Sequence, residues 1–293
     1  MQARSRSPLR SAGWWGFAFA MPAILLFLAF SLWPILNTFY LSLFKYDLLT
    51  PKEWVGVRNF ARLPADQVFL RSLKATAVYV LGTYIPVWGI SLALAMALNA
   101  KIKLRGLLRT LYFIPPMMSM VVVSVIWKLM FHHDGLLNTM LMQPLLGHPV
   151  DWLTDERWAP VAIILMSIWK ETGFYMVVFL AGLQSISSQL YEAARIDGAG
   201  GWALFRHITL PMLKPTFAFV TIISLIQGLQ AFIPQWVMAD GGPNGATTSI
   251  ALLIYRMAFV WLKMGPAAAV AVILFVLVGA VTLIQWRLQR AAS

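Results

Sequence analysis

The sequence contains no cysteine and few charged residues. The lack of cysteine excludes disulfides, thiolate metal sites and cysteine nucleophiles. Only 12% of the 293 residues are charged, whereas soluble domains carry about 25%. Hydrophobic residues make up 60% of the chain and the mean hydropathy is +0.73. A water-soluble protein of this length could not bury so much apolar surface, so we expect an integral membrane protein.

Common motifs of catalysis and nucleotide binding are also missing. The chain has no GxxxxGK[ST] phosphate loop, no GxSxG and no HExxH. His132 and His133 are adjacent in a predicted turn, and His148 and His207 are isolated, so no metal site is expected. The net charge of +12 comes without a basic helix or an aromatic–basic module, which argues against nucleic acid as a partner. We predict neither an enzyme nor a nucleic-acid-binding protein.

Six apolar stretches are long enough to cross a bilayer, which takes about 20 residues. They cover approximately residues 14–43, 72–98, 107–130, 159–183, 213–236 and 265–286. Several prolines fall in or near these stretches, and a helix bundle can satisfy the backbone groups that they free. The first stretch has a basic start, but its apolar run continues to Phe44, which is too long for a cleaved signal core.

Six spans place both termini on one side of the membrane. Basic residues are dense in the short segments at the N-terminus, at 99–106, at 184–212 and at the C-terminus, which favours the cytoplasm for all four. The sequence therefore predicts an all-α protein with six transmembrane helices and both termini inside. Its parts would be a cytoplasmic N-terminus (1–13), one transmembrane domain (14–287) and a cytoplasmic tail (288–293).

Polar residues inside the predicted spans mark a candidate solute path. Lys170 and Glu171 fall near the middle of the fourth span, where a charge is costly and usually functional. They could equally pair with other helices. At 100° per residue, one face of the fifth span holds a polar stripe with small residues, made of Ser224, Gln227, Gly228, Ala231 and Gln235.

Such a stripe suits either a tight helix contact or a path of hydrogen-bonding groups. Gln230 lies beside this stripe. We expect aromatic side chains near it as well, namely Tyr175, Trp127 and Phe232. Uncharged amides and hydroxyls among aromatic rings suit a polyhydroxylated solute better than an ion.

The loop YEAARIDGAGGWALFRHITLP at 191–211 is unusually polar for this chain. The sequence predicts a helix over 183–196, a break at the glycines that follow it, and a second short helix before Pro211. Its apolar residues exceed what a solvated loop needs: Ile196, Trp202, Leu204, Phe205 and Ile208. A protein partner is one explanation. A helix resting on lipid is the other, although Glu192 and Asp197 do not suit it.

The stretch EAARIDGAGGWALFRHITLP resembles the EAA motif of binding-protein-dependent ABC importer permeases. WVGVRNF at 54–60, FIPPMMSMVVVSVIWKLMF and LAGLQSI at 180–186 are similar to other parts of that family. GGPNGATTS at 241–249 resembles the hallmark of one branch, the first permease subunit of carbohydrate importers such as the maltose and glycerol-3-phosphate systems. The resemblance covers nearly the whole chain.

This resemblance implies the transmembrane domain of a type I ABC importer in the cytoplasmic membrane of a bacterium or archaeon. A second permease would complete the pore, two ATPases would bind ATP and Mg²⁺, and a periplasmic or lipid-anchored binding protein would deliver solute, so this chain needs no cofactor. The loop would dock on an ATPase as a coupling helix through Glu192, Ala193, Ala194, Asp197, Gly198, Ala199, Phe205, Ile208, Leu210 and Pro211.

The fifth span after the motif helps to line the solute site in related maltose permeases. The resulting solute-path residues are Ser224, Gln227, Gln230, Tyr175, Glu171, Lys170 and Trp127. Glutamines stand where asparagines are typical, and the additional N-terminal spans and large insert of the maltose permease are missing, so maltose itself is not implied. Two alternatives stay open: an importer for a non-sugar solute, and a stand-alone secondary transporter, which would show inverted repeats.

Overall fold

The computed structural model describes residues 9–100 and 103–292. Residues 1–8 of the predicted cytoplasmic N-terminus and residue 293 of the predicted tail lie outside this range. The described part is almost entirely helical, as predicted. Its one sheet is a two-stranded antiparallel pair, β1 (Phe44–Lys45) with β2 (Glu53–Trp54), in which Phe44 faces Trp54 across the ladder.

Four helices of the described chain are long and apolar enough to cross a membrane without a break. The first runs through α1 (Leu9–Phe27), a π-helical turn η1 (Leu28–Leu32) and α2 (Trp33–Leu41). The others are α4 (Gln67–Asn99), α8 (Trp158–Gln184) and α15 (Met264–Ala292). They agree with the first, second, fourth and sixth predicted spans.

The predicted third span is two helices rather than one. α5 (Arg105–Met117) and α6 (Met120–Met130) are bent by 95° at a short break. Met118 and Ser119 have extended backbones there. Pro115 and Pro116 have no N–H group for the helix ladder, so the last turn of α5 is weakened where the chain turns.

The predicted fifth span is also divided. Its helix α12 (Lys214–Leu229) ends before α13 (Ile233–Ala239) begins. Pro234 in the first turn of α13 cannot donate the N–H that would continue the helix to the carbonyl of Gln230. The expectation that Gln235 shares one helix face with Ser224 is therefore wrong, because the two residues belong to different helices.

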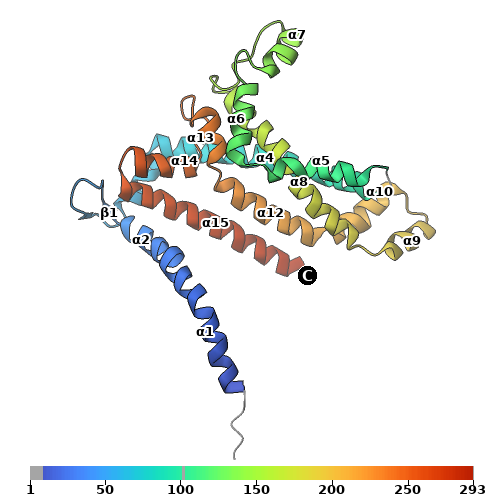
Figure 1. The fold of residues 1–293 in the computed structure, drawn as a ribbon, viewed down its shortest axis with the longest axis horizontal. Coiled ribbons are helices and arrows are strands. Elements are labelled where there is room, and N and C mark those ends of the chain that lie inside the picture. Colours follow the sequence, from blue (N-terminus) through green and yellow to red (C-terminus); the bar gives the residue numbers. More distant parts are fainter. Residues whose placement is uncertain (1–8, 101–102, 293) are drawn as a thin grey trace, which may run out of the picture.

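The remaining elements are short and lie between these helices. They are α3 (Arg58–Arg62), η2 (Leu63–Ala65), η3 (Asn138–Met142), α7 (Gln143–Leu146), α9 (Ser188–Ile196), α10 (Gly201–Leu204), η4 (Phe205–Thr209), α11 (Leu210–Met212), α14 (Ile250–Tyr255) and η5 (Arg256–Val260). In Figure 1, α9 and α10 lie at one end of the body, while β1 and α14 lie at the other end. The first long helix extends away from the body. In the most apolar stretch of its span Gly16–Leu41, no residue is buried.

The core lies where α4, α8 and α12 meet. Tyr79 and Val87 of α4 pack there with Tyr175, Met176 and Phe179 of α8. The close approach of α5 to α8 depends on Gly173, where an added Cβ would overlap the backbone oxygen of Tyr112. That oxygen is the one that Pro116, lacking an N–H, leaves without its usual helical donor. Small residues at such crossings are typical of membrane helix pairs.

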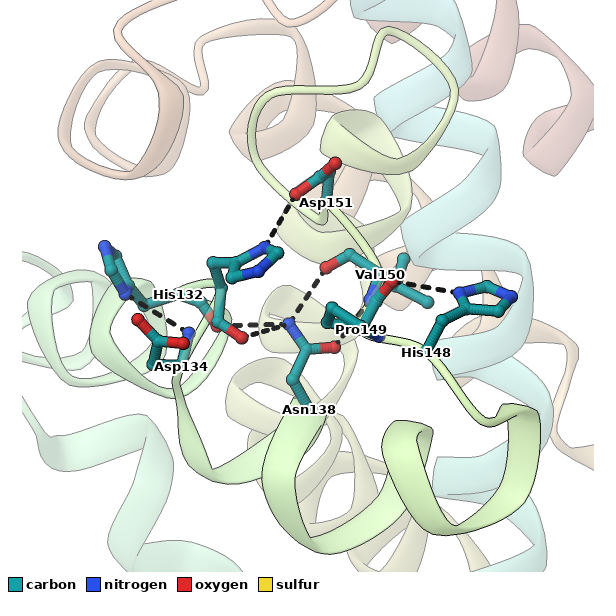
Figure 2. A network of polar contacts seen from close by, with 8 residues as sticks. His132, Asp134, Asn138, His148, Pro149, Val150 and Asp151 are labelled. Atoms are coloured by element: carbon teal, nitrogen blue, oxygen red, sulfur yellow. Dashed lines mark hydrogen bonds and ion pairs between the residues drawn. The ribbon is translucent and has the colours of Figure 1, made fainter.

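The loop between α6 and α8 is held by one buried asparagine (Figure 2). Asn138 donates to the carbonyl oxygens of His132, His133 and Val150 at 3.0–3.2 Å and 2.9 Å, and its own oxygen accepts from the Val150 N–H at 2.9 Å. His133 Nδ1 lies 3.0 Å from an oxygen of Asp151. These contacts give the histidines of this loop a structural role, in keeping with their interpretation as loop residues.

Candidate functional site

The polar loop folds into two helices joined by a tight turn. The helix predicted over 183–196 is not continuous, because α8 ends at Gln184 and α9 begins at Ser188, with three residues between them. Ser187 causes this restart because its hydroxyl accepts from the Gln189 N–H at 3.3 Å and so caps α9.

Gly198 ends α9 with a Schellman turn. The Ala199 N–H donates to the Ala194 carbonyl at 2.9 Å, and the Gly198 N–H donates to the Arg195 carbonyl at 3.1 Å. Gly198 has φ +82°, the left-handed conformation that this motif needs and that glycine adopts most easily. The break that the glycines predicted lies at this residue.

Side-chain contacts fix the second helical segment against the first. Tyr191 of α9 and Thr209 of η4 are joined through their hydroxyl groups at 2.9 Å, and the Thr209 hydroxyl also donates to the carbonyl of Leu204 at 3.3 Å. Leu204 and Thr209 are buried, while Phe205 and Ile208 are half-buried. The segment Ser188–Met212 is thus a compact unit, which we call the coupling loop.

The outer surface of the coupling loop combines apolar and acidic groups. Ile196 is 87% exposed and Trp202 is 72% exposed. Glu192 and Asp197 are exposed as well, and their carboxylates make no hydrogen bond or ion pair with any residue that the structure describes. Exposed large apolar side chains on a rigid unit are typical of a protein-docking surface. The other predicted docking residues surround them, with Ala193, Leu210 and Pro211 exposed and Ala194 and Ala199 half-buried.

A cavity of about 390 Å³ lies between the helices of the body. It is lined by residues of α4, α6, α8, α12, α13 and the break before α13, namely Tyr79, Tyr84, Met120, Glu171, Gln227, Gln230, Ala231, Phe232, Ile233 and Pro234. Both helix breaks contribute to the cavity. Met120 is the first residue of α6, and Gln230, Ala231 and Phe232 form the break between α12 and α13.

Three of the predicted path residues line this cavity: Glu171, Gln227 and Gln230. Tyr175 lies behind them, fully buried, and its hydroxyl donates to Gln227 Oε1 at 2.8 Å. Since that contact occupies the amide oxygen, the amide nitrogen of Gln227 is the group left to donate toward the cavity.

The structure does not bring the other three predicted path residues to the cavity. Ser224 is buried and accepts from Trp88 Nε1 at 3.1 Å. Lys170 donates from Nζ to the carbonyl of Pro116 at 3.2 Å. Trp127 packs against Trp169, with ring centroids 5.6 Å apart. These three residues hold helices together.

Sequence reasoning missed Tyr79, Tyr84 and Met120. The two tyrosines lie in the apolar second span, where a phenol ring is a weaker polar signal than an amide or a charge. Tyr79 is held in place by donating to Ser167 Oγ at 3.1 Å. The position of Met120 depends on the bend between α5 and α6, for which the adjacent prolines were the available signal.

A helical body with membrane-length apolar helices, a cavity that several of its helices line and a compact surface loop is the architecture expected of a membrane transport subunit. Residues 89–293 match the family of binding-protein-dependent transport system inner membrane components, and the chain belongs to this family. It is therefore a multi-pass inner-membrane permease and not an enzyme, which decides against a secondary transporter working alone.

Named relatives cover the chain almost completely. It is 38% identical over 282 residues to a lactose transport system permease protein of Rhizobium radiobacter, with 94% of each chain covered. It is 35% identical to a trehalose/maltose transport system permease protein of Thermococcus litoralis, with 94% of this chain and 93% of the relative covered.

Among solved structures, the chain is similar to a bacterial alginate ABC transporter crystallised with its alginate pentasaccharide-bound periplasmic protein. The TM-score is 0.84, the identity is 26%, and 96% of each chain is covered. These comparisons confirm two predictions from the sequence: that the chain resembles the ABC importer permeases, and that it has their fold.

Replacing Gly198 tests the turn of the coupling loop. Gly198→Ala forces a side chain into the left-handed region, at a cost of about 1 kcal/mol. We expect faster amide hydrogen exchange over residues 188–212 and weaker ATP-driven uptake. Gly200→Ala is the matched control, because Gly200 has extended backbone (φ −76°, ψ 171°) and open space around it. Equal exchange in the two variants would contradict a special role for Gly198.

Proposed function

We propose that this chain is one permease of an ABC importer for a sugar or a sugar-like polyol or phosphate solute. The observation that carries this proposal is the cavity, where two glutamine amides and a carboxylate lie among tyrosine and phenylalanine rings. Amides and carboxylates bind hydroxyl groups, and aromatic faces pack against sugar rings. Relatives named for lactose and for trehalose and maltose support the same class.

The importer needs further subunits. A second permease would form the opposite half of the pore, two ATPases would bind ATP and Mg²⁺, and a binding protein would deliver the solute. The periplasmic protein in the alginate transporter structure supports the last of these. The first long helix also supports assembly, because its unburied apolar surface is left for lipid and for a second permease to cover.

Six spans result if each bent helix pair, Arg105–Met117 with Met120–Met130 and Gly201–Met212 with Lys214–Leu229, counts as one crossing. In the second pair α12 would be the part inside the membrane. With both termini in the cytoplasm, the transmembrane domain would cover 14–287, between the N-terminal segment 1–13 and the tail 288–293. The coupling loop, within 184–212, would face the cytoplasm. Its place at the opposite end of the body from β1 and α14 agrees with this orientation (Figure 1).

The coupling loop would receive the motion of an ATPase. Glu192 would pair with a basic group of the ATPase, and Ile196 and Trp202 would fill an apolar cleft beside it. The loop passes through α11 and Leu213 directly into α12, with a bend of 62°. Because α12 carries Gln227, about 20 Å along the helix from Leu213, displacement of the loop would move one wall of the cavity.

Gln227→Leu tests the solute cavity. This substitution removes the amide but keeps the side-chain size, so we expect the KM for solute uptake to rise about tenfold while assembly with the partner subunits is unchanged. Ser224→Ala serves as the control, because its hydroxyl lies one turn away and does not line the cavity. Unaltered uptake kinetics in Gln227→Leu would remove α12 from the solute path.

Glu192→Lys tests the docking role of the loop. Reversing this exposed charge should lower the ATPase-coupled uptake at least about tenfold, while the purified permease keeps its melting temperature. Glu53→Lys makes the same chemical change at an exposed site of β2, at the other end of the body. Full coupled uptake in Glu192→Lys would refute an ion pair at this position.

A further inference from the structure

The cavity has one acidic side chain and no basic one. Among its described lining residues, Glu171 is the one carboxyl group, and none is Lys, Arg or His. Its carboxylate makes no hydrogen bond or ion pair with another residue in the described ranges, 9–100 and 103–292. The carboxylate oxygens are therefore available to a molecule in the cavity.

The adjacent cation, Lys170, makes no ion pair with the Glu171 carboxyl group and does not line the cavity. The side chains of Lys170 and Glu171 leave α8 in different directions, because neighbouring residues on a helix point about 100° apart. Only 6% of Lys170 is exposed, and its Nζ is bound to the Pro116 carbonyl of α5. α8 thus directs its positive group into the packing against α5 and its negative group into the cavity.

The polar groups around Glu171 are uncharged. Gln227 and Gln230 contribute amides, and Tyr79 and Tyr84 contribute rings and hydroxyls. A carboxylate with amide neighbours accepts hydrogen bonds from sugar hydroxyls, and charge-assisted bonds of this kind are strong. The same carboxylate repels a phosphate or carboxylate on a solute, and the low local dielectric strengthens this repulsion.

We propose that Glu171 is a specificity-determining residue that selects uncharged polyhydroxylated solutes and rejects anionic ones. This inference rests on the proposed sugar-class function and narrows it, since sugar phosphates and uronates are excluded. The fold does not decide this point, because the similar alginate transporter is described as an importer of an acidic polysaccharide.

Lactose and lactobionate are probes of similar size. Lactobionate carries a carboxylate on an open-chain unit in place of the second ring of lactose, so neutral lactitol, which has the open chain without the carboxylate, serves as the reference for ring opening. Their affinities for the purified complex of permeases and ATPases can be measured by saturation-transfer difference NMR, which detects weak binding. Leaving out the binding protein isolates the selectivity of the permeases. The wild-type complex should bind lactose about tenfold more tightly than lactobionate or better.

Glu171→Gln keeps the shape and hydrogen-bonding capacity of the side chain but removes its charge. This variant should reduce the lactose preference about tenfold, mainly by tighter binding of lactobionate. Lys170→Gln is the matched control from the neighbouring position and should leave the preference unchanged. Melting temperatures and basal ATPase activity of both variants show whether the complexes are folded.

Three results would overturn the inference, and they differ from one another. A wild-type complex that binds lactobionate as well as lactose shows that the cavity does not reject anions. An unchanged preference in folded Glu171→Gln assigns selectivity to another residue. If neither these probes nor other neutral saccharides bind or stimulate the complete importer, the sugar class itself is wrong, and the inference fails with it.

Discussion

Inside a bilayer, every backbone N–H and C=O must find its partner within the protein, and the arrangement of this cavity depends on that constraint. The chain breaks two membrane helices, at Met118–Ser119 and at residues 230–232, where Met118, Ala231 and Phe232 are half-buried while Ser119 and Gln230 are exposed. Side chains satisfy the exposed backbone there. Lys170 Nζ donates to the Pro116 carbonyl, and Ser249 Oγ donates to the Ala231 carbonyl at 2.6 Å. The breaks make room for the cavity, because a continuous helix would fill the space that Met120 and residues 231–234 surround.

The second property of the structure is mechanical continuity between the coupling loop and the cavity. The Schellman turn at Gly198 and the Tyr191–Thr209 contact make the loop a single unit. That unit continues into α12, whose Gln227 is held by Tyr175 of α8. A displacement of the loop surface can therefore be transmitted through α12 to Gln227 at the cavity.

Much of this could be predicted from the sequence, because the evidence was local or compositional. Hydropathy gave four spans with boundaries close to those observed, and the glycines located the turn after α9. The motif at 191–211 identified the family. Glu171, Gln227 and Gln230 were found because polar residues are rare in apolar spans.

The missed features depend on tertiary structure. Ser224 and Lys170 looked like path residues, but their polar atoms bind Trp88 and Pro116 of neighbouring helices. Periodicity placed Gln235 with Ser224 because it assumed a continuous helix through Pro234. Tyr79 and Tyr84 have no polar signal strong enough to stand out in an apolar helix, and their place at the cavity results from the packing of α4 against α8 and α12.

The central claim is that the coupling loop is the surface through which a separate ATPase drives this permease. The cysteine-free sequence allows a direct measurement, since Ala193→Cys creates one thiol on the exposed face of α9. A benzophenone photo-cross-linker attached at this thiol in the assembled importer should capture the ATPase, with a yield that changes when ATP binds. The same reagent should not capture the ATPase from Thr50→Cys, which is exposed in the loop between β1 and β2. β1 lies at the opposite end of the body from α9 (Figure 1). Absence of the ATPase adduct at residue 193, or equal capture from both positions, would contradict the claim.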